Sequence, residues 1–99
     1  MTTFTHDQVE TALATFEAFL DTNCQGAATF SENNGIAALR GVAIALAPTF
    51  ETIWQSKPLG YRDAVTWDWE FIPTLVRAID WDNPEKTPIA AFEQAVNSL

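Results

Sequence analysis

The sequence predicts an all-α protein, a compact bundle of four to five short helices that forms a single domain over residues 1–99. Three stretches support this prediction. Residues 6–22 repeat apolar side chains at helical spacing, residues 35–48 are apolar almost throughout, and residues 87–99 open with a helix start signal. Hydrophobic residues make up 47% of the chain, which is ample for the one modest core that 99 residues can form.

Residues 6–22 have the pattern of an amphipathic helix. Thr5 and Gln8 have the spacing of a capping box at its start. Apolar side chains share one face of this helix, and carboxylates share another. The predicted core face comprises Val9, Ala12, Leu13, Phe16, Phe19 and Leu20, and the acidic ridge comprises Asp7, Glu10, Glu17 and Asp21. We expect the acidic ridge to lie on the outer surface of the bundle.

Residues 35–48 are predicted to form the central helix against which the others pack. Their sequence, GIAALRGVAIALAP, is apolar on all sides except at Arg40, as in a helix that is buried on most of its surface. The many alanines allow neighbouring backbones to approach closely. Asn34 is the expected N-cap of this helix.

The chain on either side of this helix is expected to turn. Pro48 is predicted to open a new short helix or to cause a sharp bend, because a proline inside a helix removes a hydrogen bond and clashes with the preceding turn. Residues 23–35 and 57–61 contain the Asn, Gly, Ser and Pro residues that are typical of loops. Phe30 is expected to fold back onto the core.

Residues 64–73, AVTWDWEFIP, fit two structures. A strand over about 65–71 has alternating apolar residues and would make the protein α+β. A helix over 65–79 has apolar residues every three or four positions. We favour the helix, because a lone strand leaves its backbone groups unpaired and the other strand-like stretch, 27–31, is weak. Pro73 is then expected to kink or break this helix, and a strand followed by a helix from Pro73 is the alternative.

The end of the chain is predicted to contain a loop and a terminal helix. Residues 80–86, DWDNPEK, read as the loop. Thr87 is the expected N-cap of the final helix, and Pro88 has the fixed backbone angle that suits the first helical position.

The charge balance excludes some classes of partner. Thirteen Asp and Glu residues against five Lys and Arg give a net charge of −8, and Arg40 is the first Lys or Arg along the chain. Such a chain repels phosphate backbones and anionic lipids, so we expect no direct binding to nucleic acid or to a membrane.

The remaining composition favours a cytoplasmic protein. The single cysteine, Cys24, cannot form an internal disulfide, and the sequence shows neither a leader pattern nor a run of eighteen apolar residues. Residues 35–48 alone are too short to span a bilayer.

The sequence contains no recognisable catalytic, cofactor-binding or metal-binding motif. His6 is the only histidine, and one histidine with one cysteine cannot supply the ligands of a zinc site. Neither a nucleophile motif nor a phosphate-binding glycine pattern is present. We therefore predict no catalytic, cofactor or metal residues and no enzymatic activity.

The predicted function is protein binding through an acidic and aromatic surface. Acidic and aromatic side chains together suit a partner whose surface is basic and partly apolar. The predicted contact residues are Glu10, Glu17, Asp21, Trp67, Asp68 and Glu70. An inhibitor or immunity-type antagonist that covers the basic surface of a nucleic-acid-handling protein is the natural subclass.

Two other functions fit the same residues. The extra aromatic surface can be buried in a homodimer. Alternatively, a pocket between helices, lined by Trp and Phe, can hold a small molecule or a substrate. Trp67 can also simply fill the core against the first or the last helix, because large rings are needed in so small a core.

Overall fold

The computed structural model describes residues 6–21 and 24–99, and within these ranges it contains helices and turns and no β-strand. The predicted all-α bundle is confirmed, with six α-helices in the described residues. The helices are α1 (His6–Asp21), α2 (Gln25–Asn34), α3 (Ile36–Gln55), α4 (Leu59–Ala64), α5 (Ile72–Ala78) and α6 (Ile89–Asn97). A π-helical turn, η1 (Trp67–Phe71), precedes α5, and a 3-10 turn, η2 (Pro84–Lys86), precedes α6.

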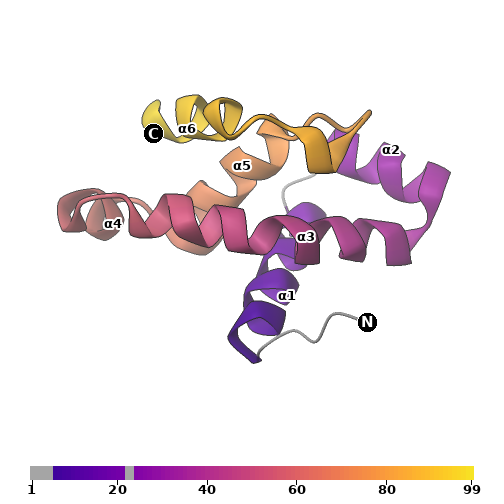
Figure 1. The fold of residues 1–99 in the computed structure, drawn as a ribbon, viewed down its shortest axis with the longest axis horizontal. Coiled ribbons are helices and arrows are strands. Elements are labelled where there is room, and N and C mark those ends of the chain that lie inside the picture. Colours follow the sequence, from indigo (N-terminus) through magenta and orange to yellow (C-terminus); the bar gives the residue numbers. More distant parts are fainter. Residues whose placement is uncertain (1–5, 22–23) are drawn as a thin grey trace.

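Helix α3 is the centre of the fold, as the sequence predicts. It runs along the length of the molecule, α1 crosses it, and α2 folds back beside its N-terminal half (Figure 1). One continuous core joins it to the other helices, and Phe50, Phe71 and Phe92 are fully buried there. Phe50 and Phe92 meet edge to face with ring centroids 5.1 Å apart, which fixes α6 against α3.

The prediction that Pro48 begins a new helix or a sharp bend is wrong, because α3 is one helix from Ile36 to Gln55. Pro48 lies on the exposed side of α3, where water can bond the carbonyl group that the missing N–H leaves free. Thr52 supports this turn by donating a hydrogen bond from Oγ1 to the Pro48 carbonyl over 2.8 Å. The carbonyl group that Pro48 leaves without an N–H donor therefore lies on the side of α3 that water reaches.

The prediction of a loop over 23–35 is wrong for Gln25–Asn34, which is helical. The same helix replaces the weak strand candidate at 27–31. Helix α2 owes its stability to packing: Ala27 is buried, and the Phe30 ring lies 5.5 Å from that of Trp81. Phe30 thus folds onto the core as expected.

A sharp corner joins α2 to α3 and shows that Asn34 is not the N-cap of α3. Gly35 has a φ of 91°, which favours glycine, and its N–H donates to the Ser31 carbonyl over 2.8 Å. Asn34 is the last residue of α2, and its Nδ2 donates to the Phe30 carbonyl. The glycine, rather than a side-chain cap, separates the two helices.

The inner face of α1 differs from the predicted one. Thr15 is fully buried, whereas Leu13 is 38% exposed and Leu20 is 55% exposed. Small side chains at Ala12, Thr15 and Ala18 let α1 approach α3 closely where the two helices cross, and Thr15 satisfies its hydroxyl by donating to the Thr11 carbonyl. Of the predicted capping residues, Thr5 lies outside the described residues, and the side chain of Gln8 is also outside the description.

Residues 64–73 adopt neither predicted structure in full. Val65 and Thr66 are extended, and the helical turns begin only at Trp67 and continue past Pro73 without a break. The first turn is a wide π turn, in which the Thr66 carbonyl accepts from both the Glu70 and the Phe71 N–H groups. The wider turn relieves the clash that the ring of Pro73 would make in an α-helix at this point.

The C-terminal helix is attached to the rest of the fold by polar contacts that the sequence did not predict. Residues 59–64 form the short helix α4 rather than only a turn, and Tyr61 donates from its hydroxyl to the Val96 carbonyl over 2.6 Å. Lys57 donates to Asn97 Oδ1 over 2.6 Å. These contacts hold the end of α6 against α4.

Thr87 does not cap α6 as predicted. It is buried, and its Oγ1 donates to the Pro84 carbonyl and accepts from the Asp80 N–H. It therefore closes the loop before α6, which begins at Ile89.

Candidate protein-binding surface

A small hollow lies where α1 packs against η1. Its volume is about 180 Å³. The lining residues are Ala14, Glu17 and Ala18 from α1 and Asp68 and Trp69 from η1. We call this site the α1–η1 hollow. It brings together one carboxylate of the acidic ridge and the acidic, aromatic stretch that the sequence analysis singled out.

The π turn decides which tryptophan faces the solvent. Trp67 is half-buried, with its ring centroid 5.3 Å from that of Trp54 and 5.5 Å from that of Phe71. Trp69 is 73% exposed. Trp67 was the aromatic contact residue expected from the sequence, but Trp69 is the more exposed of the two rings. Trp67 packs on α3 through Trp54 and so fills a satellite of the core.

Glu70 is exposed but has a structural task. Its Oε1 accepts a hydrogen bond from the Thr66 N–H over 3.0 Å, which caps the start of η1 in the manner of a capping box. Its charge also acts on Tyr61, whose pKa is raised first by burial of the hydroxyl and second by the Glu70 carboxylate. Glu70 therefore orients η1 and is no member of the hollow.

The other predicted contact residues are separated in space from the hollow or lie outside the description. Glu10 is exposed on α1 but does not line the hollow. The Asp21 side chain lies outside the described residues. Glu17 and Asp68 are both exposed and both line the hollow, although they are far apart in the sequence.

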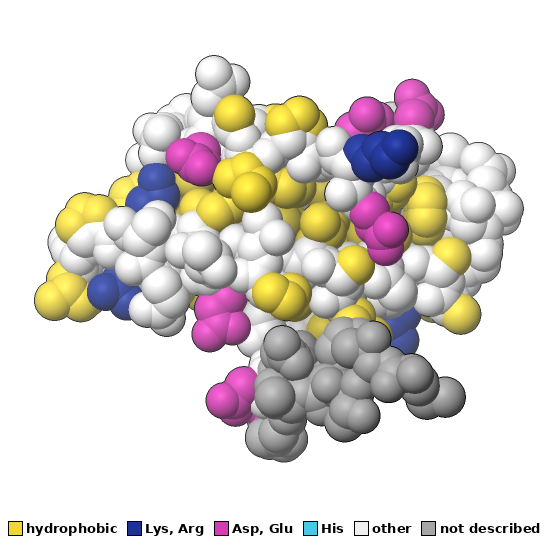
Figure 2. Space-filling view, in the orientation of Figure 1, with side chains coloured by type: hydrophobic (Ala, Val, Ile, Leu, Met, Phe, Trp, Pro, Cys, Tyr) yellow, Lys and Arg dark blue, Asp and Glu magenta, His cyan; other side chains and the backbone are white. Residues whose placement is uncertain are grey.

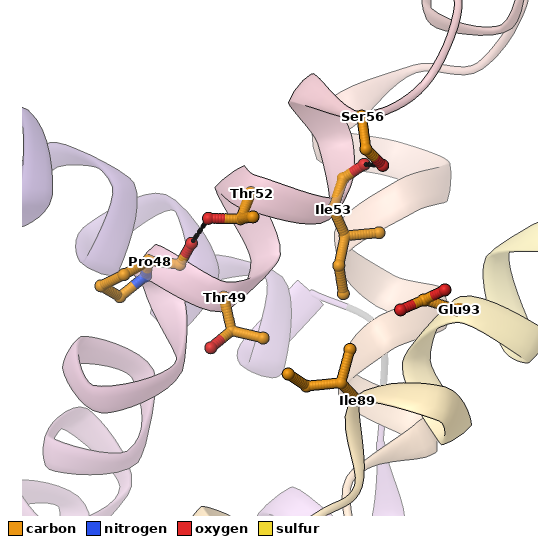
Figure 3. Close-up of a pocket in the computed structure, with 7 residues that line it drawn as sticks. All are labelled: Pro48, Thr49, Thr52, Ile53, Ser56, Ile89 and Glu93. Atoms are coloured by element: carbon orange, nitrogen blue, oxygen red, sulfur yellow. Dashed lines mark hydrogen bonds between the residues drawn. The ribbon is translucent and has the colours of Figure 1, made fainter.

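A second and larger hollow lies between α3 and α6. Its volume is about 450 Å³. The side chains of Ile53, Ile89 and Glu93 lie around it (Figure 3). The nearby hydroxyls of Thr52 and Ser56 both donate to carbonyl groups of α3 itself, so Glu93 is the one ionisable side chain in the lining. Apolar side chains gather over this part of the surface (Figure 2).

This α3–α6 groove does not match the predicted small-molecule pocket. That pocket was expected to contain Trp and Phe, and the lining of the groove contains neither. A separate hollow of about 410 Å³ beside α2 does contain both types, because Phe30 and Trp81 line it. A lone exposed carboxylate also lacks the second group that general acid–base catalysis needs.

The described residues hold no group of three or more His, Cys, Asp or Glu side chains arranged to bind a metal ion. Cys24 is a free thiol and is buried. The His6 side chain lies outside the described part of the chain.

Helix α3 is long and apolar enough, by length and composition alone, to cross a membrane, with a mean hydropathy of 1.4. The length expected from the sequence was too short for this, because Pro48 was expected to end the helix, whereas α3 continues to Gln55. The core helix of a soluble protein meets the same criterion, and α3 supplies core residues such as Leu39, Ala43 and Phe50.

No protein-family model, curated protein or solved structure matches this chain.

Proposed function

We propose that this protein binds another protein that has a basic surface, and that the α1–η1 hollow is part of the contact. The observation that carries the proposal is the position of Trp69, which exposes most of its ring beside Glu17 and Asp68. Tryptophan is enriched at the energetic centres of protein interfaces. The two flanking carboxylates select a partner of positive charge.

The charge of the whole chain supports the same partner. A net charge of −8 attracts a basic protein over a range of about one Debye length, roughly 8 Å at physiological salt. Long-range attraction of this kind raises the association rate and is weakened by salt. Binding should therefore be tight at low salt and should weaken steeply as salt is added.

An inhibitor or immunity-type antagonist of a nucleic-acid-handling protein is the form of this function that we favour. Such a target has a basic surface for phosphate groups, and an acidic protein can cover it. The proposal also holds that this protein is cytoplasmic and binds neither nucleic acid nor a membrane directly. Its negative charge and the apolar side chains that α3 buries in the core support the absence of such direct binding.

The test is capture of a partner from a bacterial lysate, its identification, and titration of the purified pair. The decisive variant reverses two charges at the hollow, Glu17→Lys with Asp68→Lys. The control reverses one Glu and one Asp that are exposed elsewhere, Glu32→Lys with Asp63→Lys. We expect the hollow variant to weaken binding far more than the control does at low salt. Equal weakening would place the contact elsewhere on the acidic surface. Failure to capture any basic partner whose binding weakens with salt would reject the proposal.

Homodimer formation is the second candidate, because of the outward face of α3. Ala37, Gly41, Ala45 and Pro48 are exposed there at helical spacing, and none of them is charged. Small residues allow close contact between helices, and a twofold interface needs such a self-complementary face. Sedimentation over a wide concentration range tests this candidate, with Ala45→Glu expected to abolish a dimer. A monomer at every concentration would exclude it.

A further inference from the structure

We infer that the α1–η1 hollow receives an arginine side chain of the partner. This inference rests on the proposed function and names the group that the hollow recognises. Three observations support it: the size of the hollow, the exposed indole face of Trp69, and the two carboxylates of Glu17 and Asp68.

The size of the hollow fits one side chain. Its volume of about 180 Å³ is below the roughly 300–1,000 Å³ that is typical of pockets for whole small molecules. Its walls at Ala14 and Ala18 are small and apolar, so they can contact the methylene stem of a long side chain. The hollow thus suits an inserted residue better than a cofactor.

The Trp69 ring is available for stacking. It is 73% exposed, and among the described residues none of the ring contacts that hold Trp54, Trp67 and Trp81 involves it. Tryptophan is the aromatic side chain that attracts a cation most strongly through its ring face, and a planar guanidinium group can also stack on it.

The carboxylates complete the complementarity. Neither Glu17 nor Asp68 has an ion-pair partner among the described residues, and both line the hollow with Trp69. A guanidinium group carries five N–H donors in a fixed fork, so it can bond both carboxylates while its face covers the indole. The ammonium group of lysine is a compact charge and lacks the planar face. Arginine therefore suits the size of the hollow, the indole face and the two carboxylates together. Lysine suits the hollow and the negative charge but cannot stack on the indole.

The experiment follows the four tryptophan indole N–H signals by NMR while a tetra-arginine or a tetra-lysine peptide is added. The Trp69 signal is assigned by its loss in Trp69→Phe. Titrations are made at about 20 mM and about 500 mM NaCl, where screening differs strongly. We expect tetra-arginine to shift the Trp69 signal saturably at low salt and tetra-lysine to bind at least about threefold more weakly.

Two variants separate the hollow from general charge attraction. Glu17→Gln with Asp68→Asn removes two charges at the hollow, and Glu32→Gln with Asp63→Asn removes two exposed charges elsewhere. The first pair should abolish the saturable Trp69 shift, and the second should leave most of it. Trp69→Leu should weaken tetra-arginine binding by about 2- to 30-fold, as measured on the backbone amide signals around the hollow.

Three results would overturn the inference. These are equal binding of the two peptides, equal loss in the two charge variants, and no shift of the Trp69 signal by tetra-arginine at low salt. The proposed function has its own test, since a captured partner that depends on salt and on the acidic surface would support it even if arginine is not the group recognised. A partner whose binding depends neither on salt nor on the acidic surface would reject both the proposed function and the arginine inference.

Discussion

Gly26 lies directly against the indole ring of Trp81, so that a Cβ atom added at Gly26 would overlap Trp81 Cδ1. Trp81 cannot move aside easily. Its Nε1 donates to the Val76 carbonyl over 3.2 Å, and its ring meets that of Phe19 edge to face. The absence of a side chain at Gly26 is therefore what lets α2 pack against the segment that follows α5.

Gly26→Ala is expected to destabilise the protein by about 1–3 kcal/mol, as overpacking of a filled site usually does. Urea denaturation followed by circular dichroism measures the change. Gly41→Ala is the matched control, because a Cβ at this exposed position in α3 meets no atom within 4 Å. That control should stabilise the protein by roughly 0.5–1 kcal/mol through helix propensity. If both variants changed the free energy of unfolding in the same direction, the packing of α2 on Trp81 would be contradicted.

The same contact explains why α2 was not predicted. The local sequence around Gly26 and Asn33 resembles a loop, and its helical state depends on burying Ala27 and on the contact between Phe30 and Trp81. That contact joins residues far apart in the chain, so no local pattern contains it. Helices α1 and α3 were predictable because their own periodicity or apolarity is strong.

Tyr61 is expected to titrate above its ordinary pKa of 10.0, because burial and the charge of Glu70 both disfavour the phenolate. It is the only tyrosine, so absorbance at about 295 nm reports it alone. Glu70→Gln keeps an acceptor for the Thr66 N–H but removes the charge, and should lower the Tyr61 pKa. An unchanged midpoint would show that the carboxylate does not act on Tyr61.

The raised pKa of Tyr61 also predicts that the protein becomes less stable at high pH. Above about pH 10 the unfolded chain loses the tyrosine proton before the folded protein does, so the free energy of unfolding falls as pH rises. The loss ends once the folded tyrosine is also ionised. Tyr61→Phe should remove this contribution, and should cost about 1 kcal/mol at neutral pH through loss of the bond to the Val96 carbonyl. Denaturation curves at several pH values measure both effects.

Adjacent residues on α1 should respond very differently to truncation. Phe19 is 3% exposed and contacts Trp81, so Phe19→Ala should cost about 3–5 kcal/mol. Leu20 is 55% exposed, and Leu20→Ala should cost less than about 1 kcal/mol. Phe16, which is only partly buried, should fall between them. Similar losses at Phe19 and Leu20 would mean that α1 buries the face predicted from periodicity.

The candidate site was only half predictable. The sequence predicted both Glu17 and Asp68 as contact residues, since acids without a neighbouring Lys or Arg stand out in a short chain, and the structure places both in the lining of one hollow. Their meeting depends on how α1 crosses the fold, and the exposure of Trp69 depends on the π turn that accommodates Pro73. A period of 3.6 residues cannot reveal a turn of a different width. The choice between the two tryptophans therefore required the structure.

Replacing Trp67 should affect mainly stability, and replacing Trp69 should affect mainly binding. Trp67 lies on Trp54 and Phe71, so Trp67→Ala should lower the free energy of unfolding by about 2–4 kcal/mol, a little less than for a fully buried ring. Trp69→Ala removes a ring that is 73% exposed and should change stability by less than about 0.5 kcal/mol. The same Trp69→Ala protein should lose affinity for a basic partner, whereas Trp67→Ala should retain it under conditions where it is folded. Thermal denaturation and a binding titration on both variants test this together. A stable Trp69→Ala protein with full affinity would remove the indole from the interface and leave only the charges.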